Sequence, residues 1–150
     1  MPEIGEPAPD FKLLSTRGEL RLQQFARGKK LIIAFYASIG ASACKCFVRS
    51  LRDEYDTIRS LGADVIAIST DTISAQYALD EFLGGCPFPL ASDFFKDTTR
   101  VYGCMSEDEK HSLRAVFVVN ADGKIVHKNL WYQPGNMAHF VEVFEALGLR

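Results

Sequence analysis

The chain has 150 residues, of which 47% are hydrophobic and 24% are charged. This length fits one domain, 1–150, and the composition is that of a packed globular protein, which excludes a mainly disordered chain. Lys and Arg number 17 and Asp and Glu number 19, giving a net charge of -2. Because nucleic-acid binders carry a basic excess, neither DNA nor RNA is expected as a partner.

The beginning of the chain lacks the pattern of a secretory signal. Acidic residues and prolines occupy 1–7, where a signal peptide would have positive charge and then an apolar stretch. The longest nearly apolar stretch, 31–44, is shorter than the roughly 20 residues that span a membrane. We therefore expect a cytoplasmic protein with no membrane partner. Structural disulfides are rare in that compartment, so the cysteines are expected as thiols. They are Cys44, Cys46, Cys86 and Cys104.

Strands and helices alternate along the predicted elements. Residues 11–14 and 19–22 flank a polar turn and predict a β-hairpin. The apolar run 31–37 predicts a strand that is buried on both faces. Apolar residues spaced three and four apart then predict a helix over 42–61. The later predicted elements are a strand at 64–69, a helix at 71–83, a short helix at 97–102, strands at 113–120 and 124–130, and a helix at 138–147.

This order of elements is that of an α/β protein with a thioredoxin-like sandwich fold. A central mixed β-sheet would be flanked by helices and preceded by the N-terminal β-hairpin. Two prolines between Cys86 and Leu90 predict a stiff extended connector, because each proline keeps its predecessor out of helical geometry. The turn at 121–123 ends in glycine and would join the last two strands as a hairpin.

Cys44 has the position that suits a nucleophile. It follows the buried strand and lies in the first turn of the predicted helix at 42–61. Backbone N–H groups and the helix dipole stabilise a thiolate there, which lowers the pKa of the thiol. The alternative is that Cys44 is a small buried residue without reactivity, as free cysteines often are.

Cys46 is two residues farther on, about 200° round a helix of 3.6 residues per turn, and should point away from Cys44. The two sulfurs cannot form a disulfide while the helix is intact. Cys46 is therefore either a partly exposed bystander or a thiol that acts only when the turn unwinds. A zinc site is not favoured, because the pair lacks a second pair of ligands.

Arg114 opens an otherwise apolar strand. A charged side chain there either reaches water at the edge of the sheet or is held inward, facing an anion. The sequence leaves both alternatives open.

Four segments together resemble the peroxiredoxin family, although each would be weak alone. Residues 35–44 are similar to the family's active-site segment, in which Pro-x-x-x-Thr-x-x-Cys follows an apolar strand. The other similar segments are the entry segment 5–11, the connector Pro-Phe-Pro-Leu-x-Ser-Asp at 87–93, and Arg114 with the Asp-Gly-Lys-Ile turn at 122–125. The subgroup that the chain resembles most is the bacterioferritin comigratory protein type.

The resemblance implies an oxidoreductase, a thiol-dependent peroxidase of antioxidant defence or redox homeostasis that reduces hydrogen peroxide or small organic hydroperoxides. It implies that Cys44 attacks the O–O bond and that Arg114 polarises the oxygens, without a metal, haem or flavin cofactor. A sulfenic acid on Cys44 would then condense with a thiol, and a thioredoxin-like protein or a small-thiol reductant would open the disulfide. A monomer and a homodimer both fit this scheme.

The chain departs from the family at three positions. Ala37 and Ala41 stand where the family has Pro and Thr, and Phe47 replaces a glutamate. The lost threonine hydroxyl would cost about 1.5–3 kcal/mol, or about ten- to more than a hundredfold in rate. We therefore expect reduced activity unless Ser38 or Ser42 supplies the hydrogen bond.

The sequence does not identify the resolving thiol, which is the one that attacks the sulfenic acid on Cys44. Arg49 stands where one branch of the subgroup has its resolving cysteine. Cys86 is the first internal candidate, Cys104 is the second, and an external thiol is the alternative.

Two other functions remain open. Ala37, Ala41 and the extra Cys46 favour a thiol-disulfide exchange or redox-sensor protein with a degenerate peroxidase site. The absence of Cys-x-x-Cys, and of a proline before Arg114, counts against a thioredoxin-type reductase. A binding module that keeps the fold without thiol chemistry is the third possibility.

Overall fold

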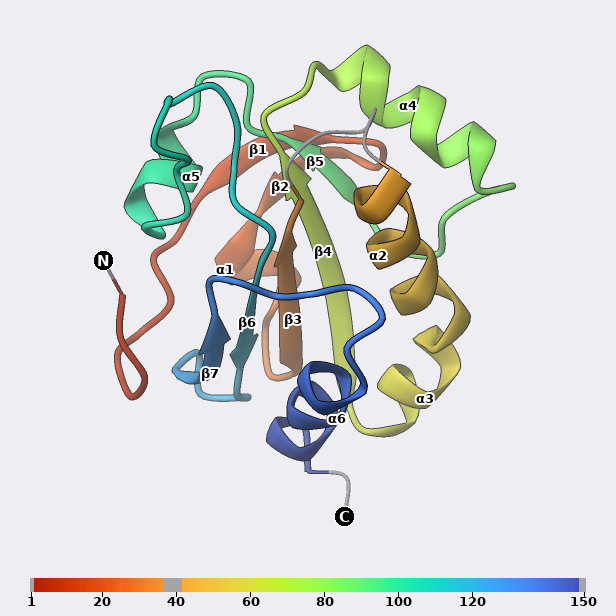
Figure 1. Cartoon of the computed structure of the whole chain (residues 1–150). Coiled ribbons are helices and arrows are strands. Elements are labelled where there is room, and N and C mark those ends of the chain that lie inside the picture. The colour runs from red at the N-terminus through yellow and green to blue at the C-terminus, as the bar shows by residue number, and fades with distance from the viewer. Residues whose placement is uncertain (1, 37–41, 149–150) are drawn as a thin grey trace.

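The computed structural model describes residues 2–36 and 42–148, and it describes the side chains of these residues except 42–44. Seven strands of the described chain form one sheet with the order β2-β1-β5-β4-β3-β6-β7 (Figure 1). The strands are β1 (Lys12–Ser15), β2 (Gly18–Arg21), β3 (Lys30–Phe35), β4 (Ala63–Ser69), β5 (Leu90–Ser92), β6 (Ala115–Val119) and β7 (Ile125–Asn129).

The sheet is mixed, as predicted. Its centre is parallel, because β3 pairs with β4 and β4 pairs with β5 in the same direction. The flanking strands are antiparallel: β6 pairs with β3 and β1 pairs with β5. The residues 31–35 of β3 and all of β4 are buried, because helices or connecting segments cover both faces of the sheet.

Helices lie on both faces of this sheet. The described helices are α1 (Leu22–Phe25), α2 (Ser42–Asp53), α3 (Tyr55–Ser60), α4 (Ile73–Phe82), α5 (Asp97–Val101) and α6 (Met137–Ala146). Buried side chains of α2, α3, α4 and α6 form one apolar cluster with Ile32 and Ala34 of β3. A second cluster contains the alternate residues Leu31 and Ile33, together with Phe11, Leu22 and Tyr102. These clusters are the two cores of an α/β sandwich.

The hairpin β1–β2 forms as predicted, with Leu13 paired to Leu20. The helix predicted at 71–83 forms as α4, and its N-cap is Thr72, whose side chain accepts a hydrogen bond from the Ala75 N–H at 3.2 Å. No helix in the described part of the chain is both long enough and apolar enough to cross a bilayer.

Two predictions of local structure need correction. The helix predicted over 42–61 is divided at Glu54 into α2 and α3, although Glu54 N still donates to Ser50 O and Ile58 N donates to Glu54 O.

The connector predicted at 86–90 leads into a short strand, β5, which the sequence did not indicate. β5 has only three residues and follows two prolines, so the local pattern is weak there. It is a strand because it pairs with β4 and β1, which lie elsewhere in the sequence.

Candidate active site

The backbone brings the two predicted site residues to one end of the sheet. Cys44 is the third residue of α2, so it lies in the first turn of the helix that follows β3. Arg114 directly precedes β6, and the register pairs its neighbour Ala115 with Phe35, the last residue of β3. Arg114 therefore lies at the carboxyl end of β3. The Cys44 side chain and residues 37–41, which include Ala37 and Ala41, lie outside the described residues.

Arg114 is on the sheet face that α2 covers. Val116 and Val118 of β6 belong to the cluster that contains the buried residues of α2. Side chains alternate between the faces along a strand, so Arg114 shares the face of Val116. Tyr36, the residue after β3, belongs to the same cluster. The start of α2 and Arg114 thus share both an end and a face of the sheet.

The Arg114 side chain is held inward. It is partly buried, and its Nε atom is buried without a hydrogen-bond partner among the groups that the structure describes. Its backbone carbonyl accepts a hydrogen bond from Tyr132 N at 3.0 Å, which fixes the segment after β7 against Arg114. A buried guanidinium N–H without a partner is costly unless a ligand or water satisfies it. Of the two alternatives for Arg114, the described geometry favours the one facing inward toward an anion or a polar ligand.

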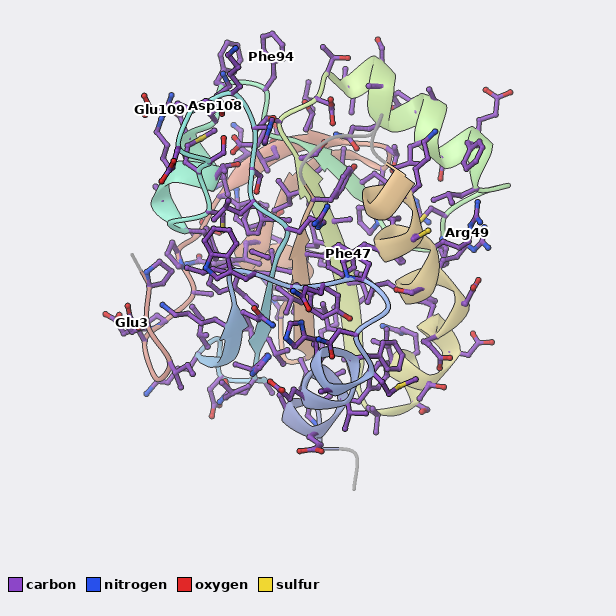
Figure 2. The ribbon with its side chains drawn as sticks, viewed as in Figure 1. Glu3, Phe47, Arg49, Phe94, Asp108 and Glu109 are labelled. Carbon is purple, nitrogen blue, oxygen red and sulfur yellow. The ribbon has the colours of Figure 1, made fainter. Side chains whose placement is uncertain are left out.

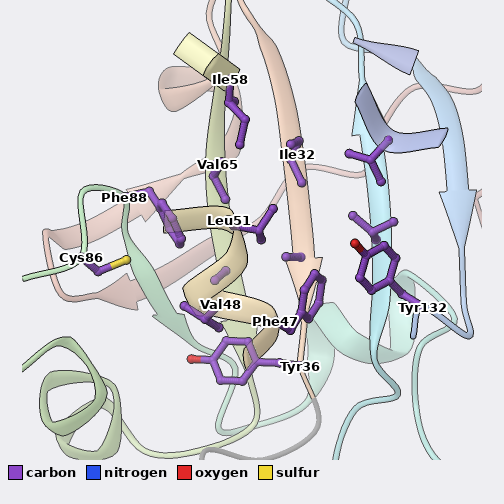
Figure 3. Close-up of a cluster of buried hydrophobic side chains, with 14 of the residues drawn as sticks. Ile32, Tyr36, Phe47, Val48, Leu51, Ile58, Val65, Cys86, Phe88 and Tyr132 are labelled. Carbon is purple, nitrogen blue, oxygen red and sulfur yellow. The ribbon is translucent and has the colours of Figure 1, made fainter. Parts of the chain in front are cut away.

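Phe47 takes the place of the glutamate that the family resemblance suggested. Its side chain is fully buried and stacks on Tyr132, with ring centroids 4.6 Å apart. Figure 3 shows the two rings side by side, and Figure 2 shows Phe47 pointing into the molecule while Arg49 points outward. Apolar packing therefore replaces a charged side chain one helical turn after Cys44.

A buried polar chain begins at Tyr36, next to the undescribed segment 37–41. The Tyr36 hydroxyl donates a hydrogen bond to Gln76 Oε1 of α4, and Gln76 Nε2 donates to Ser69 Oγ at 2.6 Å. Ser69 Oγ in turn donates to Asp71 Oδ2 at 2.9 Å. Burial raises the pKa of the Tyr36 phenol, so Tyr36 is a neutral donor. A tyrosine that ends a buried strand signals that its hydroxyl needs a partner, but the sequence pattern does not indicate which residues supply it.

The three other cysteines are free thiols in different surroundings. Cys46 is exposed on α2, as its helical phase predicted. Cys86 is buried on the α2 side of the sheet, and desolvation raises the pKa of its thiol to about 11. Cys104 is buried on the opposite side, where desolvation also raises its pKa. The structure thus places one candidate resolving cysteine on each face of the sheet.

A cavity of about 310 Å³ adjoins Arg114. Residues 111–114, which lead into β6, form one part of its wall, and residues 131–133, which follow β7, form the other. Trp131 is 72% exposed, whereas the next residue, Tyr132, is buried. Trp131 was not predicted as a site residue, and its position next to the predicted strand at 124–130 was the only signal in the sequence.

Comparison with solved structures supports the fold. The chain superposes on BcpB from Mycobacterium tuberculosis with a TM-score of 0.86, covering 100% of this chain and 99% of BcpB at 22% identity. It superposes on a peroxiredoxin 6 of Arenicola marina with a TM-score of 0.87 at 20% identity, covering 98% of this chain and 74% of that one. The predicted thioredoxin-like fold is therefore confirmed.

Sequence comparison gives the family. YkuU of Bacillus subtilis, whose name assigns it to the peroxiredoxins, is 28% identical over 141 residues, covering 86% of this chain and 78% of YkuU. Peroxiredoxin-2 of Rattus norvegicus is 28% identical over 130 residues, covering 80% of this chain and 65% of the relative. The AhpC/TSA family model matches residues 4–128. The chain therefore belongs to the AhpC/TSA family, the peroxiredoxins that its sequence resembles.

Proposed function

We propose that the protein is a thiol peroxidase in which Cys44 is the nucleophile and Arg114 stabilises the reacting oxygens. Membership of the peroxiredoxin family supports thiol peroxidase chemistry in general. The observation that carries the assignment to these residues is the position of Arg114. Its side chain, with an unpartnered Nε among the described groups, lies at the end and on the face of the sheet where α2 begins.

In the first step, the Cys44 thiolate attacks the terminal oxygen of a hydroperoxide. The S–O bond forms as the O–O bond breaks, and the electron pair passes to the leaving oxygen, which takes a proton. The first turn of α2 supports this step because helix N-termini stabilise a thiolate. Arg114 supplies fixed positive charge where negative charge develops, which lowers the barrier without reorganisation.

In the second step, a thiol attacks the Cys44 sulfenic acid, water leaves and a disulfide forms. An external thiol suits this step better than Cys86 or Cys104. Both internal thiols are buried with raised pKa values, whereas attack requires an accessible thiolate. We therefore propose that a thioredoxin-like protein or a small thiol supplies the two electrons. The three free thiols among the described residues suit a reducing compartment such as the cytoplasm.

Stopped-flow measurement of peroxide consumption by the reduced protein tests this function. The wild type should react much faster than free cysteine, Cys44→Ser should abolish the reaction, and the matched control Cys46→Ser should retain it. Mass spectrometry after one equivalent of peroxide should find the added oxygen, or a mixed disulfide, on Cys44. A rate equal to that of free cysteine and unchanged in Cys44→Ser would contradict the proposal.

Disulfide exchange is the second candidate, and the exposure of Cys46 on α2 is the observation that favours it. An exposed thiol two residues after Cys44 can take part in exchange with a partner without opening the core. Insulin-disulfide reduction, assayed beside peroxide turnover, separates the two functions. Exchange that depends on Cys46, without peroxide turnover, would favour this candidate.

A further inference from the structure

The structure holds His127 with one ring nitrogen buried and without a partner. His127 pairs with Val118 across β7 and β6, so its side chain lies on the α6 side of the sheet, in the layer of the apolar cluster to which Val118 belongs. Its Nε2 atom is buried without a hydrogen-bond partner among the groups that the structure describes. A neutral imidazole can carry its proton on Nδ1 and leave Nε2 bare, whereas an imidazolium carries a proton on both nitrogens. Charging His127 therefore puts an unsatisfied N–H group into an apolar layer, which is costly.

The charged groups around His127 do not offset this cost. Desolvation lowers the pKa of His127, the carboxylate of Glu142 on α6 raises it, and the charge of His139 lowers it again. Glu142 is exposed, so water screens its attraction. Lys128, the next residue of β7, lies on the other side of the sheet, where its Nζ pairs with Glu3 at 3.0 Å. The fold therefore favours the neutral form of His127.

His139, in the first turn of α6, is fitted to the neutral form in a different way. Its Nδ1 atom accepts a hydrogen bond from the backbone N–H of Gln133 at 3.1 Å. Protonation turns Nδ1 into a donor, so this bond exists only while Nδ1 carries no proton. The ring also lies against Tyr132, with ring centroids 5.8 Å apart. His139 therefore ties α6 to the segment that leads into it.

The segment that His139 holds also holds Arg114. It covers 130–136 and crosses from β7 to α6 in front of the sheet (Figure 1). The Tyr132 N–H donates to the Arg114 carbonyl at 3.0 Å, and the Tyr132 ring stacks on Phe47 of α2. The amide of Tyr132 is thus bonded to Arg114, while the next amide along the chain is bonded to His139. Two adjacent peptide groups therefore join α6 to Arg114.

We propose that His127 and His139 form an acid-sensitive latch, which closes the segment 130–136 on Arg114 while both rings are neutral and releases it when they are protonated. Below about pH 6.5, the open form binds protons that the closed form excludes, so acid shifts the population toward the open form. Opening gives His127 Nε2 access to water and gives up the bond at His139 Nδ1. The latch goes beyond the proposed function, because it concerns the conformation of the segment rather than the chemistry of the thiol.

Hydrogen exchange at single amides, measured by NMR, tests the latch directly. In the wild type, the protection factors of the Tyr132 and Gln133 amides should fall about tenfold or more between about pH 7.5 and about pH 5, while those within β6 stay unchanged. The protection factor divides out the effect of pH on the exchange chemistry itself. His139→Asn supplies a hydrogen-bond acceptor at every pH, and His127→Leu removes the titrating ring. The double variant should therefore lose the pH dependence.

His111→Gln changes the third histidine of the chain and is the matched control, so it should keep the wild-type fall. Circular dichroism at both pH values checks that each variant is folded. If the double variant does not fold, His139→Asn alone decides, because it should protect the Gln133 amide better than the wild type at about pH 5. The proposal is overturned by an equal fall in the wild type and the variant, or by unchanged protection in the wild type.

Peroxide kinetics tests whether the latch acts on the candidate site. The rate constant at about pH 5.5, divided by that at about pH 7.5, should be about threefold or more higher in the double variant than in the wild type. The reason is that titration of Cys44 is common to both proteins, whereas release of Arg114 occurs only in the wild type. Equal ratios would overturn the connection to Arg114. Absence of reaction with peroxide in the wild type would contradict the proposed function, whereas a fall in protection confined to the wild type would still support the latch.

Discussion

Phe47 stacks on Tyr132 with a centroid distance of 4.6 Å and an interplanar angle of 24°. This contact joins α2, the helix that contains Cys44, to the segment that lines the cavity at Arg114. Both rings are almost fully buried. The relative position of the two halves of the candidate site therefore depends on apolar packing, at a position where the family resemblance suggested a carboxylate.

Phe47→Ala should lower the free energy of unfolding by about 3–5 kcal/mol, because it removes a buried aromatic ring and leaves a cavity. Phe47→Leu should cost less, since it fills part of the space. Urea unfolding followed by circular dichroism measures both. The control Arg49→Ala changes an exposed residue of the same helix and should cost much less. A cost for Phe47→Ala similar to that of the control would show that the stack contributes little.

Gln76→Leu should destabilise the fold by about 1–3 kcal/mol, because the buried Tyr36 hydroxyl then loses its acceptor and Ser69 Oγ loses a donor. Tyr36→Phe should cost less than Gln76→Leu, since it leaves fewer groups unsatisfied. A double-mutant cycle of the two substitutions, measured by urea unfolding, gives their interaction energy. Strict additivity would be the result that contradicts coupling between the two side chains.

Arg114→Gln should lower the second-order rate constant for oxidation of the protein by peroxide about ten- to a hundredfold, because a charged hydrogen-bond donor at the reacting oxygens is lost. Arg114→Lys should recover only part of the rate, since an ammonium lacks the planar fork of the guanidinium. Stopped-flow kinetics measures these rates, and Arg21→Gln at an exposed position is the control. Wild-type rates in Arg114→Gln would remove this residue from the site.

Stability should fall as the pH rises from about 9 to about 11, in part because of Cys86. Burial raises the pKa of its thiol from 9.0 to about 11, so the folded state keeps a proton that the unfolded state loses. The contribution is fully present below pH 9 and is lost as the pH passes through the folded pKa, with a total of about 2–3 kcal/mol.

Urea unfolding under reducing conditions at a series of pH values measures this effect. Cys86→Ala should show a shallower fall than the wild type, and the slopes are compared because the substitution itself alters packing. Buried phenols and Cys104 act in the same direction in both proteins, so they do not alter the comparison. Equal slopes would show that Cys86 does not contribute.

The sequence predicted the strands and helices whose signal is local. The apolar run at 31–37 and the strand at 64–69 correspond to β3 and β4, because strands buried on both faces are apolar throughout. Among the apolar residues spaced three and four apart in 42–61, Val48, Leu51 and Ile58 are buried and Tyr55 is partly buried, as expected for a helix with one face on a sheet. β5 escaped prediction because three residues after two prolines carry little signal without the neighbouring strands.

The candidate site was only partly predictable. The positions of Cys44 and Arg114 followed from the helix start and from the family resemblance, and their catalytic roles stay predictions. The stack of Phe47 on Tyr132 and the bond from Tyr36 to Gln76 join residues far apart in the chain. Such pairs are set by how the layers pack, which the apolar pattern of a single segment does not contain. The single domain over 1–150 and the lowered pKa of Cys44 also stay predictions.

The positions of Cys86 and Cys104 have a consequence for measuring the dynamics of this fold. The two thiols lie in the cores on opposite faces of the sheet. A buried thiol reacts with an alkylating reagent only when the structure around it opens, and local openings differ in free energy across a protein. The labelling rates of Cys86 and Cys104 therefore report separately how often each of the two layers opens, within one unmodified chain.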